Sequence, residues 1–156
     1  MIQVIPATMA HAARLDLRPG DRAEIAALGL TPDLALRRSL ERALWSDAYV
    51  VHDGEGAGGE VAAIVGLGLP SMLARVATPW LLTGMPVDRH RKAFLRLTRE
   101  RVERLRGEWA ELVNYVHADY AQAVRWLAWL GFSLAPAAPF GPRGALFHRA
   151  TLRGLR

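Results

Sequence analysis

In the C-terminal half of the chain, three side chains that can move protons stand close together: His117, Asp119 and Tyr120. A histidine titrates near neutral pH and can take a proton from an ammonium group, and a tyrosine hydroxyl can protonate a leaving group. Tyr115 is a second candidate for that acid. A structural interpretation stays open beside this one: Tyr115 fills a strand, His117 hydrogen-bonds a backbone group, and Asp119 caps the next helix.

A second group that could bind a ligand is the basic run Arg89, His90, Arg91 and Lys92, at the expected start of a long helix. Cations in the first turn oppose the helix macrodipole, at a cost of about 0.3 to 1 kcal/mol each. An anion such as a phosphate would offset that cost. The alternative is a solvated basic turn in which Asp88 caps the helix.

Other kinds of site are excluded or disfavoured. The chain has no cysteine, which rules out disulfides, thiolate metal sites and cysteine nucleophiles. The remaining histidines His11, His52 and His148 have no spacing that would gather a metal ion, so we expect no metal site. No serine stands in a nucleophile elbow.

The chain has 156 residues and a formal charge of +5, and all but one of its 20 basic residues are arginine. This balance favours encounters with phosphates. Within 88–109, however, arginines alternate with glutamates at helical spacings, which is typical of a solvent-facing helix and not of a nucleic-acid-binding surface. No stretch reaches the roughly 18 apolar residues of a membrane span, and no leader is apparent. We therefore expect a soluble, cytoplasmic protein that binds neither membrane nor nucleic acid.

Glycines crowd the stretch GEGAGG at 54–59. A nucleotide-binding glycine loop must open a helix, and a Walker loop also needs a following lysine. Here the glycines separate two segments rich in β-branched residues, 47–53 and 60–69. That arrangement predicts a β-hairpin, with a nucleotide loop as the alternative.

The elements needed to position these groups follow from periodicity, caps and breakers. We predict strands at 1–5, 47–53, 60–69, 75–86, 112–117, 132–136 and 145–151, and helices at 8–17, 21–29, 31–45, 88–109 and 123–132. Thr8, Asp21 and Thr31 are the expected N-caps. The order predicts one α/β (α+β) domain, residues 1–156. Its single, mostly antiparallel mixed sheet of about seven strands is flanked by helices, and a β-α-β unit supplies the parallel pair.

The last predicted helix, AVRWLAWLGF, carries a resemblance. Ala123, Leu127, Gly131 and Phe132 fit the pattern A-x-x-x-Y-x-x-x-G-F of the GNAT superfamily, the acetyl-CoA-dependent N-acyltransferases. The region 79–151, with PWLLT, LVNYVHADYAQAVRWLAWLGF and FHRAT, resembles a narrower group, the GNAT-like internal virion protein A of short-tailed phages.

The resemblance implies a binding site for acetyl-CoA. It implies that the strand residues Leu81, Leu82 and Thr83 offer backbone groups to the pantetheine arm. It implies that the pyrophosphate lies at the start of the next helix, which here carries Arg89, Arg91 and Lys92. It also implies that the strands on either side of that helix separate after Pro79, which leaves a V-shaped opening beside Arg89.

The sequence departs from the family pattern at two places. The turn VDRHRKAF has no glycine where most members have several, and Leu127 replaces the tyrosine that protonates the leaving thiolate. Two functions stay open. One is N-acetyl transfer to an amine, with His117, Asp119 and Tyr120 at the amine and Tyr120 as substitute acid. The other is a non-catalytic phage protein that binds a protein partner, or a second copy of itself, through the helix of Trp126 and Trp129.

Overall fold

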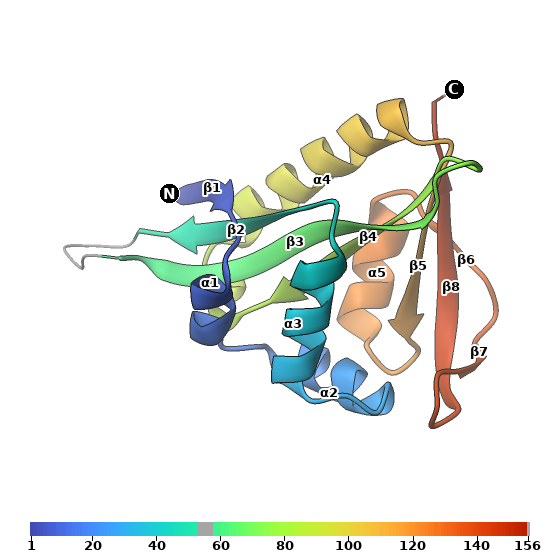
Figure 1. The fold of residues 1–156 in the computed structure, drawn as a ribbon, viewed down its shortest axis with the longest axis horizontal. Coiled ribbons are helices and arrows are strands. Elements are labelled where there is room, and N and C mark those ends of the chain that lie inside the picture. Colours follow the sequence, from blue (N-terminus) through green and yellow to red (C-terminus); the bar gives the residue numbers. More distant parts are fainter. Residues whose placement is uncertain (53–57, 156) are drawn as a thin grey trace.

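The computed structural model describes residues 1–52 and 58–155 (Figure 1). The strands are β1 (Ile2–Pro6), β2 (Trp45–Val51), β3 (Glu60–Ser71), β4 (Val76–Thr83), β5 (Glu111–His117), β6 (Ser133–Leu134), β7 (Ala138–Phe140) and β8 (Ala145–Arg153). The helices are α1 (Met9–Arg14), α2 (Pro19–Ala27), α3 (Pro32–Arg42), α4 (Arg91–Glu108) and α5 (Ala121–Trp129), with a short 3-10 turn, η1 (Met85–Asp88). None of the described helices is both long enough and apolar enough to cross a membrane.

The strands form one sheet in the order β1-β2-β3-β4-β5-β8-β6, and β7 pairs with β8 beside this path. All neighbours run antiparallel except β4 and β5, which are parallel and are connected by α4. The predicted mixed, mostly antiparallel sheet and its β-α-β unit are confirmed. The sheet has eight strands and not seven, because residues 138–140 pair with β8 even though Pro139 lies in the middle. Proline is tolerated there at a sheet edge, where its missing N–H is not needed.

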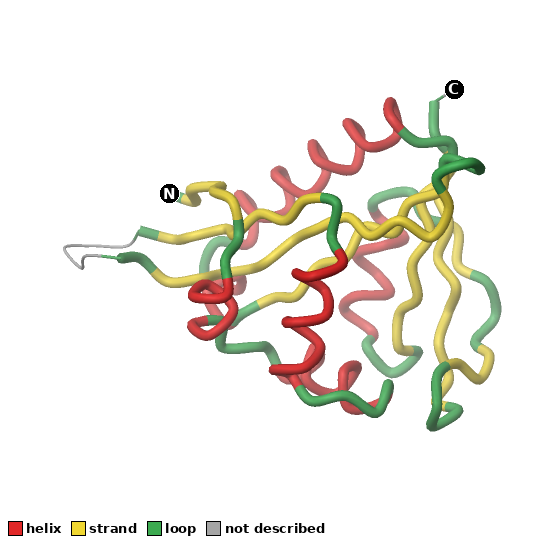
Figure 2. The backbone as a smooth tube through the Cα atoms, in the orientation of Figure 1, coloured by secondary structure: helices red, strands yellow, loops and turns green. Residues whose placement is uncertain are grey.

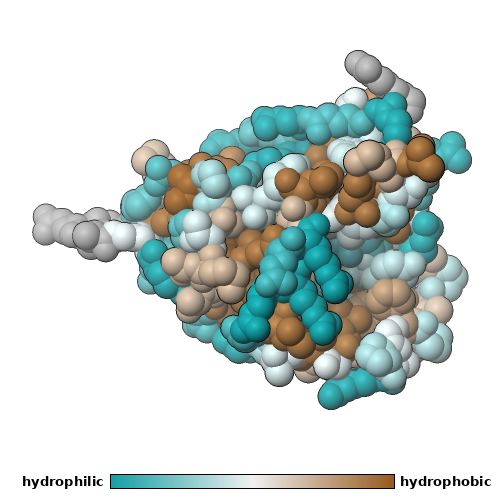
Figure 3. Space-filling model, in the orientation of Figure 1, coloured by the Kyte–Doolittle hydropathy of each residue, from teal (hydrophilic) through white to brown (hydrophobic). Residues whose placement is uncertain are grey.

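Helices cover both faces of the sheet (Figure 2). One hydrophobic cluster joins α1, α2 and α3 to the side chains of Val61 and Ile64. Two others join α4 and α5 to the opposite face, with Phe94, Val102 and Leu127 among their buried members. The surface that carries α1 to α3 shows hydrophobic patches between hydrophilic side chains (Figure 3).

The helix starts follow the predicted caps at two of three places. The hydroxyls of Thr8 and Thr31 accept hydrogen bonds from the first turns of α1 and α3. Asp21 does not cap α2, because Pro19 begins that helix two residues earlier. Asp21 therefore lies inside the first turn and is buried.

The predicted antiparallel pairing of β2 with β3 is confirmed by the register from Trp45 opposite Leu67 to Val51 opposite Glu60. Residues 53–57 of the expected hairpin connection, including Gly54 and Gly56, lie outside the described residues.

Candidate active site

The site forms where β4 and β5 separate. In the described chain these strands pair only at Val76 and Ala77, opposite residues 111–112. Pro79 follows two residues later and has no N–H to offer a neighbouring strand. On its other side β4 stays paired with β3 as far as Thr83. The predicted V-shaped opening between β4 and β5 is therefore present.

Asn114 spans the narrow end of this opening. Its Nδ2 donates to the carbonyl of Pro79 at 2.5 Å, and its Oδ1 accepts from the backbone N–H of Tyr115 at 2.7 Å. These bonds satisfy backbone groups that a continued ladder would have paired. A side chain thus replaces the ladder at the point where the strands part.

A cavity of about 360 Å³ occupies the opening. Its walls come from β2, β3, β4, β5, α2, α4 and α5. Most of the lining is apolar and includes Leu81, Phe94 and Trp126, whereas Asp21 and Glu24 bring carboxyl groups to it. An apolar cavity with a few polar groups is the usual form of a small-molecule site.

The backbone of β4 offers free groups to the cavity at Leu81. Groups of alternate residues point the same way along a strand. The carbonyl of Pro79 points toward β5, where Asn114 binds it, and the N–H of Gly84 points the other way, to the carbonyl of Ala62. The N–H and C=O of Leu81 therefore face the opening.

The other two predicted strand residues differ from Leu81. Leu82 pairs with Ile64 of β3, and its side chain packs in the cluster of α1 to α3. Thr83 borders the cavity, but Asp21 accepts its N–H at 3.3 Å and its carbonyl accepts the N–H of Arg18 at 3.0 Å. The backbone of Thr83 is thus already engaged.

The residues of the basic run 89–92 also differ from one another in their contacts. Asp88 ends η1, and His90 is the residue that precedes α4, without a capping side-chain hydrogen bond. Asp88 is thus not the cap that the sequence suggests. Arg89 forms an ion pair with Glu60. Arg91 and Lys92 are exposed in the first turn of α4, and neither has an acidic partner among the described residues.

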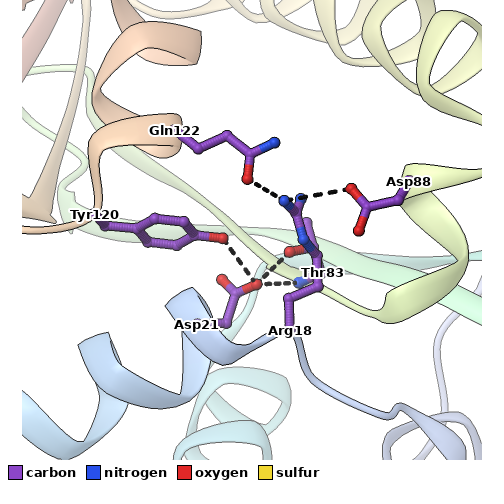
Figure 4. Close-up of polar contacts among 6 residues, drawn as sticks. All are labelled: Arg18, Asp21, Thr83, Asp88, Tyr120 and Gln122. Atoms are coloured by element: carbon purple, nitrogen blue, oxygen red, sulfur yellow. Dashed lines mark hydrogen bonds and ion pairs between the residues drawn. The ribbon is translucent and has the colours of Figure 1, made fainter.

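A hydrogen-bonded group of residues lines one end of the cavity. Figure 4 shows the contacts among these residues. The hydroxyl of Thr83 donates to Asp21 Oδ2, and the hydroxyl of Tyr120 donates to the same oxygen at 3.4 Å. Burial, followed by the nearby charge of Asp21, raises the pKa of Tyr120 to about 12. The phenol therefore keeps its proton at neutral pH. Burial also raises the pKa of Asp21, against the hydrogen bonds from Thr83.

Arg18 crosses the same end of the cavity from the residue before α2. Its guanidinium donates to Gln122 Oε1 and lies 3.5 Å from Asp88 Oδ1. Only 12% of its side chain is exposed. The ion pair and hydrogen bond tie α2, α5 and the turn before α4 together (Figure 4).

Glu24 is the second carboxyl group of this end and was not predicted from the sequence. It lies one helical turn after Asp21, and both border the cavity. Its Oε2 accepts the backbone N–H of His117 at 2.9 Å. Burial raises its pKa to about 7, with a smaller contribution from the charge of Asp21, despite the opposing hydrogen bond.

The structure separates the three residues of the predicted proton-transfer group. Tyr120 borders the cavity, whereas His117 and Asp119 do not. The ring of His117 lies against Phe147, and its Nε2 is 3.9 Å from Asp119 Oδ2. The Asp119 side chain is 91% exposed and does not cap α5, which Tyr120 precedes. Tyr115 stacks on Phe140 at 4.0 Å.

One face of helix α5, with Ala123, Val124, Trp126 and Leu127, packs against the core. Leu127, at the family's tyrosine position, is buried among α4 and β5 residues. Trp126 stacks on Phe94 at 6.4 Å between centroids, and its buried Nε1 has no hydrogen-bond partner among the described residues. Trp129 is 44% exposed and lies under the guanidinium of Arg99 at 4.0 Å. The helix therefore packs against the core and also borders the cavity.

No protein-family model and no curated protein matches the sequence. Solved structures do match the fold. A protein assigned as a phosphinothricin N-acetyltransferase superposes with a TM-score of 0.69 at 10% identity, covering 100% of both chains. A GCN5-related N-acetyltransferase from Kribbella flavida has a TM-score of 0.63 at 21% identity, covering 97% of each chain. A GNAT-superfamily phosphinothricin acetyltransferase from Sinorhizobium meliloti, in complex with AcCoA, has a TM-score of 0.64 at 14% identity, covering 98% of this chain and 89% of that one. The chain therefore has the GNAT fold.

Proposed function

We propose that the protein is an acyl-CoA-dependent N-acyltransferase that moves an acetyl group from the thioester to an amine. The observation that carries the proposal is the separation of β4 from β5 around a cavity of about 360 Å³, with the backbone of Leu81 directed into it. An unpaired strand edge can bind an extended, amide-containing arm in the way that it binds a peptide.

The residues present fit the coenzyme at both ends of this arm. Leu81 would pair with the amides of pantetheine, and the first turn of α4 would receive the pyrophosphate on free N–H groups. In most members a glycine-rich turn binds the phosphates through its backbone N–H groups. Here Arg91 and Lys92 would add positive charge from their side chains. Arg89 is less suited to that role because Glu60 already binds it.

Acetyl-CoA would supply the acyl group in an activated form, as a thioester. The chain would contribute chiefly by positioning and by donating hydrogen bonds to a polarised carbonyl at β4. Tyr120, which is protonated at neutral pH, stands at the cavity in place of the missing tyrosine at position 127 and is the candidate acid. His117 acts indirectly in this proposal, since its backbone holds Glu24, and Asp119 has no role in it.

Thermal unfolding with and without acetyl-CoA tests the proposal. A ligand that binds only the folded protein adds about 2.7 kcal/mol at a hundred times its dissociation constant. We expect a rise in the unfolding temperature with acetyl-CoA and release of free thiol when an amine is added. No shift at millimolar acetyl-CoA would contradict the proposal.

A non-catalytic role is the second candidate, and Leu127 is the observation that favours it. In that role the GNAT fold would serve a phage protein that binds a partner or a second copy through the Trp126 and Trp129 face of α5. The relationship to phage internal virion proteins and the location in the host cytoplasm or the virion stay predictions. Coenzyme binding without transfer to any amine would favour this candidate.

A further inference from the structure

We propose that Glu24 is the general base of the reaction and that the acceptor is a primary amine that arrives as an ammonium ion without a carboxylate beside it. This inference rests on the proposed acyl transfer. The proposed coenzyme contacts at β4 and α4 identify neither a general base nor the acceptor, and this inference names both.

The first argument is position. Glu24 borders the cavity at its α2 side, on the same wall as Asp21 and near Tyr120 of the β5–α5 connection. Its Oε2 is anchored by the backbone N–H of His117, the last residue of β5. The carboxyl group is thus fixed to the end of β5, the strand across the opening from β4 and its free backbone groups.

The second argument is access. The other oxygen of Glu24 has no hydrogen-bond partner among the described residues. It is also not among the buried side-chain atoms that lack a partner, so solvent reaches it, and Glu24 lines the cavity. One oxygen is therefore held and the other is available, which is the arrangement a proton acceptor needs.

The third argument is charge. The titratable groups that interact with Glu24 are Asp21 on its own helix and Tyr120 from the β5–α5 connection, and His117 contacts it through its backbone N–H. Arg18, which also borders the cavity, is already engaged by Gln122 and Asp88. An ammonium group would find carboxyl groups here, whereas a carboxylate on the acceptor would be repelled by Asp21 and Glu24.

The proton transfers balance as follows. Glu24 takes one proton from the ammonium group, and the freed nitrogen forms the C–N bond as the C–S bond breaks. Tyr120 gives its proton to the departing sulfur and regains one from the nitrogen of the new amide. Glu24 then releases its proton to solvent, so that the products are the amide, the free thiol and one proton.

The experiment compares wild type with Glu24→Gln, using acetyl-CoA and 1,4-diaminobutane, with thiol release followed from pH 6 to 10. Glutamine keeps an acceptor for the His117 N–H but cannot take a proton. Glu41→Gln, an exposed carboxyl group on α3, is the matched control. We expect kcat at pH 7.5 to fall about 100-fold in Glu24→Gln. The deficit should shrink to about 10-fold or less near pH 10, where the amine is itself deprotonated. Acetyl-CoA binding, measured by calorimetry, should not change.

The outcomes separate the two proposals. If wild type binds acetyl-CoA and transfers acetyl groups, and Glu24→Gln matches it across the pH range, Glu24 is not the base while the acyltransferase function stands. If wild type neither binds acetyl-CoA nor releases thiol, the proposed function is wrong and the role of Glu24 falls with it. A pH-independent loss in Glu24→Gln would also contradict general-base catalysis. The substrate class is overturned if 4-aminobutanoate, which has the same amine and a carboxylate, is used as well as the diamine.

Discussion

The two sides of the cavity have opposite electrostatic character. On the β4 and α4 side, Arg91 and Lys92 stand exposed at a helix start without acidic partners among the described residues. On the α2 side, Asp21 and Glu24 bring carboxyl groups into a partly buried setting where their pKa values rise. A site that joins an anionic coenzyme to a cationic acceptor needs this separation, because each ligand is then attracted to its own side and repelled from the other.

The largest effect that we expect concerns the acidic side and pH. Glu24 has a pKa of about 7 in the folded protein against an ordinary value of 4.5. The folded protein favours the protonated form of Glu24. The contribution of this group to the free energy of unfolding is therefore fully present below about pH 4.5 and is lost as the pH rises through about 7. The loss amounts to at most about 3 kcal/mol.

Chemical denaturation of wild type and Glu24→Gln at pH 5 and pH 8 measures this effect. The variant should lose less stability than wild type between the two values, by up to about 3 kcal/mol. Glu41→Gln should follow wild type. Parallel changes in all three proteins would show that Glu24 is not buried as described.

A smaller effect is expected from the packing that holds Tyr120 at the acidic side. A Cβ added at Gly20 would overlap the Tyr120 ring, so Gly20→Ala must displace the phenol or strain α2. We expect destabilisation of about 1 to 3 kcal/mol in thermal unfolding. Gly107→Ala in α4 is the control, because a Cβ added at Gly107 would have no other atom within 4 Å. It should be stabilised by about 0.5 to 1 kcal/mol. Equal effects at the two positions would mean that the Tyr120 ring does not occupy this place.

The smallest effect is expected on the basic side. Replacing Arg91 and Lys92 together by alanine should weaken acetyl-CoA binding about tenfold, or about 1.4 kcal/mol. The difference from wild type should shrink as salt is added, since both side chains are exposed. Calorimetry at two salt concentrations measures this, with Arg37→Ala on α3 as the control. Unchanged affinity in the double variant would place the phosphates elsewhere.

The same contrast explains what could be predicted from the sequence. The strands, the helices and the basic run depend on residues that are neighbours in the chain, so caps, periodicity and charge indicate them. The acidic side depends on contacts between Glu24 and His117, 93 residues apart, and between Asp21 and Thr83, 62 residues apart. In the sequence, Asp21 has the residue type and position expected of a helix cap. Its burial beside the cavity depends on tertiary contacts. Asn114 was missed for a similar reason, because its role exists only where β4 and β5 part.

Amide hydrogen exchange at Leu81 tests the central claim most directly. Its N–H faces the opening and is free, whereas the N–H of Leu82 points to β3, with which it is paired. Acetyl-CoA should slow the exchange at Leu81 strongly and change that at Leu82 little. If the protein binds acetyl-CoA while exchange at Leu81 stays as fast as in the free protein, the open edge of β4 does not hold the coenzyme, and the account of the site is wrong.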